Sequence, residues 1–221
     1  MATIKKKLFG EVIGRYGDWV GRVRYGKYYI ASRPSRYRMS KAPHEVDKRN
    51  RFKVNGLFAK AIKENELLYK AWYINRAPAT TAYNKICKVN FKRCGTERPT
   101  ADNLITPPGG FGLEITGGEA FNDRIEVDLV PFEIMENEKR VVFSMIVSFH
   151  EPKRKEYDPF TAKVIRDYEL EDLKLSFNFS SQEKEIAKHY NKRTIFLAVV
   201  TEDAKGNIIR WSDTVSRELF I

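Results

Sequence analysis

Arginine and lysine alternate with tyrosine and tryptophan close to the N-terminus. The basic members of this set are Arg22, Arg24, Lys27, Arg33, Arg36 and Arg38, and the aromatic members are Tyr16, Trp19, Tyr25, Tyr28, Tyr29 and Tyr37. Cations neutralise phosphates and aromatic rings stack on bases, so this combination is typical of nucleic-acid binding. It equally fits a hairpin whose aromatic residues pack across strands while its arginines meet an acidic neighbouring subunit. Both interpretations stay open at the level of sequence.

The charge of the chain is divided unevenly. Residues 1–100 carry 24 Lys and Arg against 7 Asp and Glu, whereas residues 101–221 carry 16 against 22. The formal net charge of +11 is therefore an average of two unlike halves. Such polarity favours a polyanion or an acidic protein surface as the partner of the first half, including the acidic half of a second copy.

One stretch imitates a nucleotide-binding loop. Gly21-Arg-Val-Arg-Tyr-Gly26-Lys27 has P-loop spacing, but bulky side chains fill the loop and Tyr28 replaces the hydroxyl that would bind magnesium. A phosphate cradle also needs a following helix, and here alternation predicts a strand. Nucleotide hydrolysis is therefore not expected at this point.

Other residues capable of chemistry are scattered. His44, His150 and His189 have no second ligand at helical or hairpin spacing, and we expect them to be surface or rim residues. Cys87 and Cys94 lie seven apart in one helix and its end, which favours reduced thiols over a disulfide. The sequence contains no Gly-x-Ser-x-Gly nucleophile motif. We therefore predict no catalytic residue, no metal site and no cofactor.

Periodicity predicts the elements that position the basic set. Strict alternation around Gly26 indicates a β-hairpin with one arginine-rich face, because Gly supplies the positive φ of a tight turn. Three helices should follow, with apolar residues at helical spacing. We expect them from about Ser40, from Glu64 to Ile74, and after Pro78 with Thr80 or Thr81 as cap.

The second half of the sequence reads as β-structure. Alternating or continuous apolar runs predict strands, and one helical insertion is expected at residues 181–190. The predicted strands are 124–130, 141–149, 173–179, 194–201 and 208–211. The fold class expected is thus α+β, with an N-terminal hairpin plus helices and a C-terminal antiparallel β-sandwich of immunoglobulin or fibronectin type III style.

Prolines and glycines crowd between these halves and suggest a domain border. We expect a basic hairpin and helical module at residues 1–100, a Pro/Gly-rich linker at 101–112 and an acidic β-sandwich at 113–221. No run of about 18 apolar residues exists, so no transmembrane helix and no membrane partner are expected. The N-terminus lacks the apolar core of a signal peptide, which favours a cytoplasmic location or one within a particle.

Several segments resemble a family of small basic bacterial proteins of unknown function. The resemblance lies in Phe9-Gly10-Glu-Val-Ile-Gly14-Arg-Tyr-Gly17-Asp-Trp-Val-Gly21, in Tyr25 to Pro34, in Arg49-Asn-Arg-Phe52 and in Trp211-Ser-Asp-Thr. It covers the first 100 residues well and the rest loosely. Since the family has no established activity, the resemblance implies only a glycine-rich hairpin joined to a C-terminal β-sandwich.

The function expected from these observations is that of a non-enzymatic structural or assembly protein, with a virion or another particle as one fitting setting. Its basic module would dock on an acidic protein surface or on copies of itself. The alternatives are a nucleic-acid-binding accessory protein and an enzyme with an unrecognised site. The predicted partner-binding residues are Arg22, Arg24, Tyr25, Lys27, Arg33, Arg36, Arg38, Lys48, Arg49, Arg51 and Lys53.

Overall fold

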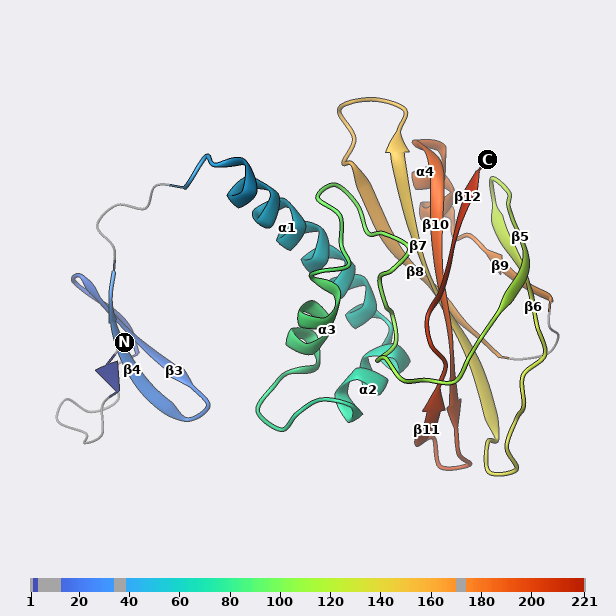
Figure 1. Cartoon of the computed structure of the whole chain (residues 1–221), viewed down its shortest axis with the longest axis horizontal. Coiled ribbons are helices and arrows are strands. Elements are labelled where there is room, and N and C mark those ends of the chain that lie inside the picture. The colour runs from blue at the N-terminus through green and yellow to red at the C-terminus, as the bar shows by residue number, and fades with distance from the viewer. Residues whose placement is uncertain (1, 4–12, 34–38, 170–173, 221) are drawn as a thin grey trace. The chain divides into compact units, whose positions relative to one another are not determined.

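A computed structural model describes residues 2–3, 13–33, 39–169 and 174–220 of the chain (Figure 1). The chain divides into two compact units, Met1–Glu45 and Val46–Ile221, and each is described by itself. In the described residues the structure consists of antiparallel β-sheets and four helices.

The first unit is a four-stranded antiparallel sheet in the order β1-β4-β3-β2. Its strands are β1 (Ala2–Thr3), β2 (Gly14–Tyr16), β3 (Trp19–Arg24) and β4 (Lys27–Ser32). The predicted hairpin is β3–β4, and its two turn residues, Tyr25 and Gly26, have φ of 52° and 70°. Positive φ at both central residues is the mark of a type I′ turn, whose twist matches that of the flanking strands.

The helices fall where periodicity predicts them. They are α1 (Pro43–Glu64), α2 (Glu66–Ile74), α3 (Ala82–Asn90) and α4 (Ser181–Lys188). Side-chain oxygens of Asn65, Thr81 and Ser180 accept backbone N–H groups and so cap α2, α3 and α4. Thr81 is thus the cap of the third helix, one of the two residues expected.

Two further antiparallel sheets form the centre of the second unit. Strands β7 (Arg140–Pro152), β8 (Phe160–Glu169), β10 (Tyr190–Glu202), β11 (Ile208–Trp211) and β12 (Val215–Phe220) make one sheet, ordered β11-β10-β7-β8 with β12 also paired to β10. Strands β5 (Ile115–Ala120), β6 (Arg124–Leu129) and β9 (Lys174–Asn178) make the other. Strands β5, β8 and β12 were not among those predicted.

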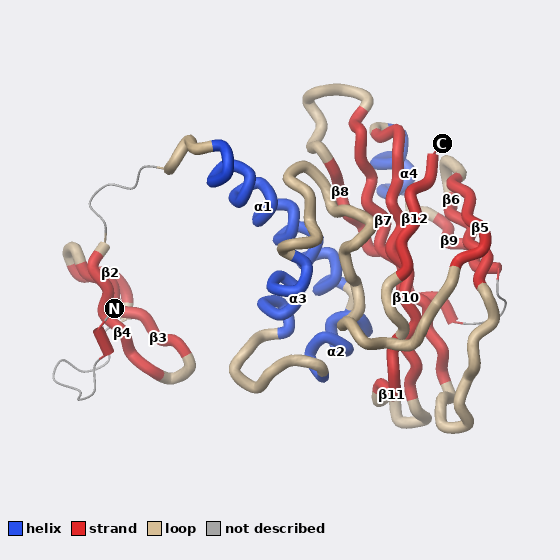
Figure 2. The backbone as a smooth tube through the Cα atoms, viewed as in Figure 1, coloured by secondary structure: helices blue, strands red, loops and turns tan. Residues whose placement is uncertain are grey.

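The five-stranded sheet is covered on both faces (Figure 2). Phe143, Met145 and Phe149 of β7 point toward β5, β6 and β9, with which they share one hydrophobic core. The alternate residues Val142 and Ile146 pack against α1, α2 and α3 in a second core. This double burial explains why β7 reads as a continuous apolar run rather than an alternating one.

The division into units differs from the predicted border near residues 101–112. The helices belong with the sheets of the second unit. Phe58, Trp72 and Ile86 are fully buried in the core that the helices share with the five-stranded sheet, on the face of that sheet opposite β5, β6 and β9. The chain instead divides at Glu45–Val46, near the start of α1.

The Pro/Gly-rich segment is fastened to the sheet. The Trp211 indole Nε1 donates to the Pro107 carbonyl at 2.9 Å, Asp213 Oδ1 accepts from the Gly110 amide at 3.0 Å, and Thr214 Oγ1 accepts from the Ile105 amide at 2.9 Å. The residues Trp211-Ser-Asp-Thr therefore hold the Pro/Gly-rich segment against β11 and the start of β12.

Gly110 is a position where this attachment leaves no room for a side chain. A Cβ there would lie 2.5 Å from the carbonyl carbon of Ser212 and 2.6 Å from the Asp213 amide nitrogen. We predict that Gly110→Ala lowers the free energy of unfolding by about 1–3 kcal/mol, because backbone must shift to admit the methyl group. Gly112→Ala is the matched control, since nothing lies within 4 Å of its Cβ position. Urea unfolding of both variants checks this; equal losses would contradict the account.

Candidate partner-binding surface

The strand register divides the side chains of the N-terminal sheet between two unlike faces. Residues that pair across antiparallel strands lie on the same face, and successive residues of a strand alternate between faces. Trp19 pairs with Tyr16 and Ser32, and Gly21 pairs with Gly14 and Ile30. The next residue along β3, Arg22, pairs with Tyr29 and therefore lies on the opposite face.

One face is basic. Its cationic side chains are Arg15, Arg22, Arg24 and Lys27, and all four are exposed. Arg24 and Lys27 are a cross-strand pair at the turn, so two like charges stand side by side. Like charges directly opposite each other destabilise a sheet unless an anion lies between or above them. The basic face is thus suited to an acidic surface.

The other face carries no charged residue in β2, β3 or β4. It consists of three rows across the strands, which are Tyr16, Trp19 and Ser32, then Gly14, Gly21 and Ile30, then Val23 and Tyr28. Tyr16 is 79% exposed, Trp19 58% and Val23 44%. We call these eight residues the uncharged face.

The N-terminal unit has no hydrophobic core of its own among its described residues. The first buried apolar side chain in the part of the chain that the structure describes is Val54, which belongs to the second unit. A sheet this small needs an apolar face buried against another layer to be stable. On the uncharged face, Gly21 is buried and Tyr28 and Ile30 are half-buried, whereas Tyr16, Trp19 and Val23 are exposed.

The structure brings only part of the predicted partner-binding set together. Arg22, Arg24 and Lys27 share the basic face, and Tyr25 lies in the turn with the Arg24 guanidinium 5.5 Å from its ring. Arg33 follows β4, where its amide donates to the Asp18 carbonyl. Arg36 and Arg38 lie outside the described residues. Lys48, Arg49, Arg51 and Lys53 are on α1 within the second unit, so they belong to a separate body.

Two features of this surface were not predicted from the sequence. Arg15 completes the basic face but was not predicted, because the pairing of β2 with β3 depends on a register that the glycines obscure. The uncharged face was not recognised as a surface, although the alternation of Trp19, Gly21 and Val23 with Val20, Arg22 and Arg24 was visible.

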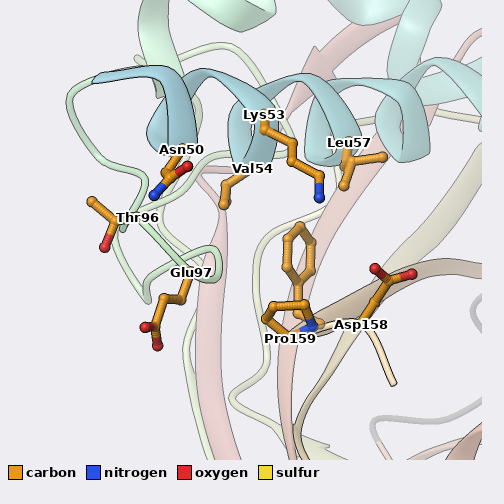
Figure 3. Close-up of a pocket in the computed structure, with 9 residues that line it drawn as sticks. Asn50, Lys53, Val54, Leu57, Thr96, Glu97, Asp158 and Pro159 are labelled. Carbon is orange, nitrogen blue, oxygen red and sulfur yellow. The ribbon is translucent and has the colours of Figure 1, made fainter. Parts of the chain in front are cut away.

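Two small hollows lie between α1 and the start of β8. They measure about 180 and 200 Å³, below the roughly 300 Å³ typical of the smallest ligand sites. In the first, Val54 and Leu57 point from α1 toward the segment with Pro159, and the carboxylates of Glu97 and Asp158 lie on opposite sides (Figure 3). Lys53 of the predicted set lines this hollow.

A larger hollow of about 500 Å³ lies between the ends of β5 and β12. Its charged lining residues are Glu119, Arg217 and Glu218. Glu218 is already engaged, because its Oε1 accepts from Arg98 Nη1 at 3.0 Å. The hollow therefore offers one cation between two carboxylates rather than a set of groups converging on a ligand.

The thiols and imidazoles of the described residues do not gather into a reactive site. Both cysteines are free, and burial raises the pKa of Cys94 to about 11, which keeps it a thiol. Within the described part of the chain no group of three His, Cys, Asp or Glu side chains could hold a metal ion. His44 is exposed, and His189 stacks on Tyr157 with ring centroids 4.4 Å apart.

His150 differs from the surface position expected for it. It is fully buried at the end of β7, where Thr194 Oγ1 lies 2.9 Å from its Nε2 and Arg98 Nη1 lies 2.7 Å from its Nδ1. Burial and the Arg98 charge lower its pKa to about 4. His150 is therefore a neutral polar residue inside the fold at physiological pH.

Arg193 is the least expected buried residue. Its guanidinium lies between the rings of Phe149 and Phe179 at 5.6 and 5.0 Å from their centroids, and its Nη1 donates to the Phe121 carbonyl. Its Nε and Nη2 have no hydrogen-bond partner among the described residues. Burial lowers the pKa of Arg193 to about 10. Nothing in the strand pattern of β10 distinguishes this arginine from a solvent-facing one.

Comparison with known proteins leaves the family open. No protein-family model matches the chain, and no curated protein matches it. Among solved structures, the fibronectin type III domain of human fibronectin type III domain containing protein 3 is similar with 14% identity and a TM-score of 0.25, over 52% of this chain and 86% of that one. A TM-score this low carries no conclusion about fold or function. No described helix is both long and apolar enough to span a bilayer.

The position of His150 predicts a particular dependence of stability on pH. Its pKa is about 4 in the folded protein and about 6.5 when unfolded, so only the unfolded chain takes up a proton between these values. Stability should therefore fall as pH drops from about 6.5 to 4, with His150 contributing roughly 3 kcal/mol of that loss. His150→Gln should reduce the slope over this window in urea unfolding. An unchanged slope would show that the folded imidazole takes up the proton as readily as the unfolded one.

Proposed function

We propose that the protein is a non-enzymatic assembly protein whose N-terminal sheet docks by its basic face on an acidic protein surface. The observation that carries this proposal is the common face of Arg15, Arg22, Arg24 and Lys27. Four exposed cations on one side of a sheet attract an acidic surface and fix its orientation, since opposite potentials steer association and set register.

The separation of rings from cations favours a protein partner over nucleic acid. Binding of single strands combines cations along the backbone with aromatic rings on which bases stack, and both must face the same groove. Here Tyr16, Trp19 and Tyr28 lie on the face opposite the arginines. Tyr29 shares the basic face and Tyr25 lies at its edge, so a nucleic-acid-binding accessory role remains the second candidate.

We infer that the two facing sheets of the second unit form an immunoglobulin or fibronectin type III-like β-sandwich. The arrangement of β5-β6-β9 against β8-β7-β10 and β12, all antiparallel around one core, supports this. We also infer kinship with the small basic bacterial family that the sequence resembles. Its glycine-rich segment corresponds in part to β2, β3 and β4, and its Trp211-Ser-Asp-Thr end to the attachment of the loop before β5.

Removal of the basic face tests the proposal. We predict that Arg22→Ser, Arg24→Ser and Lys27→Ser combined weaken binding of the full chain to poly-L-glutamate by about 10-fold or more, since exposed charges contribute roughly 0.2–1 kcal/mol each and more as a cluster. Fluorescence anisotropy with labelled poly-L-glutamate measures this.

The matched control removes three exposed lysines of the second unit, Lys63, Lys88 and Lys92, and should change binding little. Equal loss in both triple variants would mean that net charge alone is responsible. A single-stranded oligonucleotide bound with a log–log salt slope near −3, as four phosphate contacts would give, would favour the nucleic-acid alternative.

A further inference from the structure

We propose that the hollow between the ends of β5 and β12 binds a small organic carboxylate, whose carboxylate group pairs with Arg193. This site lies in the second unit, so it is separate from the basic face on which the proposed function rests. Three features of Arg193 point to it, which are its burial, the pair of nitrogens that it leaves without partners and its place behind the hollow.

Arg193 is a buried charge with too few partners. It is fully buried, and its guanidinium lies between the rings of Phe149 and Phe179. One nitrogen, Nη1, donates to the Phe121 carbonyl, but no carboxylate of the described residues forms an ion pair with it. Its pKa of about 10 keeps it charged at neutral pH. Because a buried charge is strongly unfavourable without a counter-ion, this position calls for an anion.

The unpartnered nitrogens of Arg193 form one edge of its guanidinium. Nε and Nη2 have no hydrogen-bond partner among the described residues. They are neighbours in the planar group, and their N–H bonds along this edge are nearly parallel. A carboxylate matches such an edge, because its two oxygens accept both hydrogen bonds at once. The unsatisfied part of Arg193 therefore suits a carboxylate.

Arg193 lies directly behind the hollow. The carbonyl to which it donates belongs to Phe121, and its partner across β10 and β12 is Leu219. Both of these residues line the hollow, together with Ala120 and Phe220. The volume of about 500 Å³ is within the range of small-molecule sites. An apolar group attached to the carboxylate would thus find apolar walls next to Arg193.

A second arginine stands on the same face of the sheet as Arg193. Arg217 pairs with Ile195 and Leu219 pairs with Arg193, so the two arginines are diagonal neighbours on adjacent strands. Arg217 is exposed and lines the hollow. It is therefore placed to attract an anion at the opening, while Arg193 binds the anion inside.

The two carboxylates that line the hollow lie on other faces of their strands. Glu218 follows Arg217 and is on the opposite face of β12, where its Oε1 accepts from Arg98. Glu119 pairs with Glu126 on the face of β5 and β6 that is turned away from the core. An anion bound to the two arginines would not share a face with either carboxylate.

The seam between β5 and β12 gives a way in. Among the described residues β5 pairs with β6 and β12 pairs with β10, and no ladder joins β5 to β12. The two strands touch at Gly118, where a Cβ would lie 3.6 Å from Arg217 Cδ and from Leu219 Cδ2. Side-chain contacts open at a lower cost than paired strands, so we expect the ligand to enter along this seam.

Titration of the full chain with hexanoate, followed by calorimetry, tests the proposal. Hexanoate should bind with a Kd of about 1 mM or tighter. Hexanamide has the same apolar chain without the charge and should bind roughly 10-fold more weakly or worse. Arg193→Met should lose the preference for hexanoate. No binding of hexanoate by the wild type, or equal binding of hexanoate and hexanamide, would overturn the proposal.

Two controls guard against a loss of folding. Arg193→Met replaces a buried charge by an apolar side chain of similar length, so the fold should persist. Arg154→Met, at an exposed arginine between β7 and β8, should bind hexanoate like the wild type. In the wild type, the NMR signal of the Arg193 Nε–H group should shift with hexanoate but not with hexanamide. An unmoved signal would contradict the proposal, as would an Arg193→Met variant that binds hexanoate normally.

Inorganic phosphate separates an organic carboxylate from anions in general. Phosphate that bound as tightly as hexanoate, and equally dependent on Arg193, would show an inorganic anion site and make the proposal wrong. The combined Arg22→Ser, Arg24→Ser and Lys27→Ser variant should bind hexanoate normally. Arg193→Met should in turn bind poly-L-glutamate normally, so this proposal and the proposed function fail separately.

Discussion

The pairing of β7 with β10, buried on both faces, is the constraint on which the rest of the second unit depends. Twelve paired positions join the two strands, and their side chains alternate between one core shared with β5, β6 and β9 and another shared with α1, α2 and α3. Since neither face can meet water, helices and a second sheet are both required. The loop before β5 then has to pass along β11 and β12, where Trp211 and Asp213 hold it.

The N-terminal sheet is in the opposite situation, because no apolar side chain among its described residues is fully buried. Register places all four of its strand cations on one face, among them Arg22 and Arg24, while Trp19 and Val23 lie exposed on the other. The exposed cations of that face are the surface on which the proposed docking rests. The buried apolar side chains of the described residues lie in the second unit.

Features that depend on neighbouring residues, such as helix caps and tight turns, could be predicted from the sequence. Features that depend on contacts between distant segments could not. Thr81 and the turn at Gly26 were readable because a cap and a tight turn need particular residues at particular places. Strand β5 escaped notice because two glycines occupy its centre, and β12 because its short segment alternates weakly. The burial of Arg193 and His150 depends on neighbours from distant strands. The basic face was foreseen at Arg22 and Arg24, whereas the α1 residues predicted with it lie in another unit.

Hydrogen exchange followed with and without poly-L-glutamate tests the central claim most directly, namely that the basic face of the N-terminal sheet docks on an acidic surface. The amides of β3 and β4 should exchange more slowly when the polymer is present, because binding stabilises the sheet that carries Arg22, Arg24 and Lys27. The amides of β7 and β10 should exchange at the same rate with and without the polymer. Exchange in β3 that does not respond to poly-L-glutamate would contradict the account.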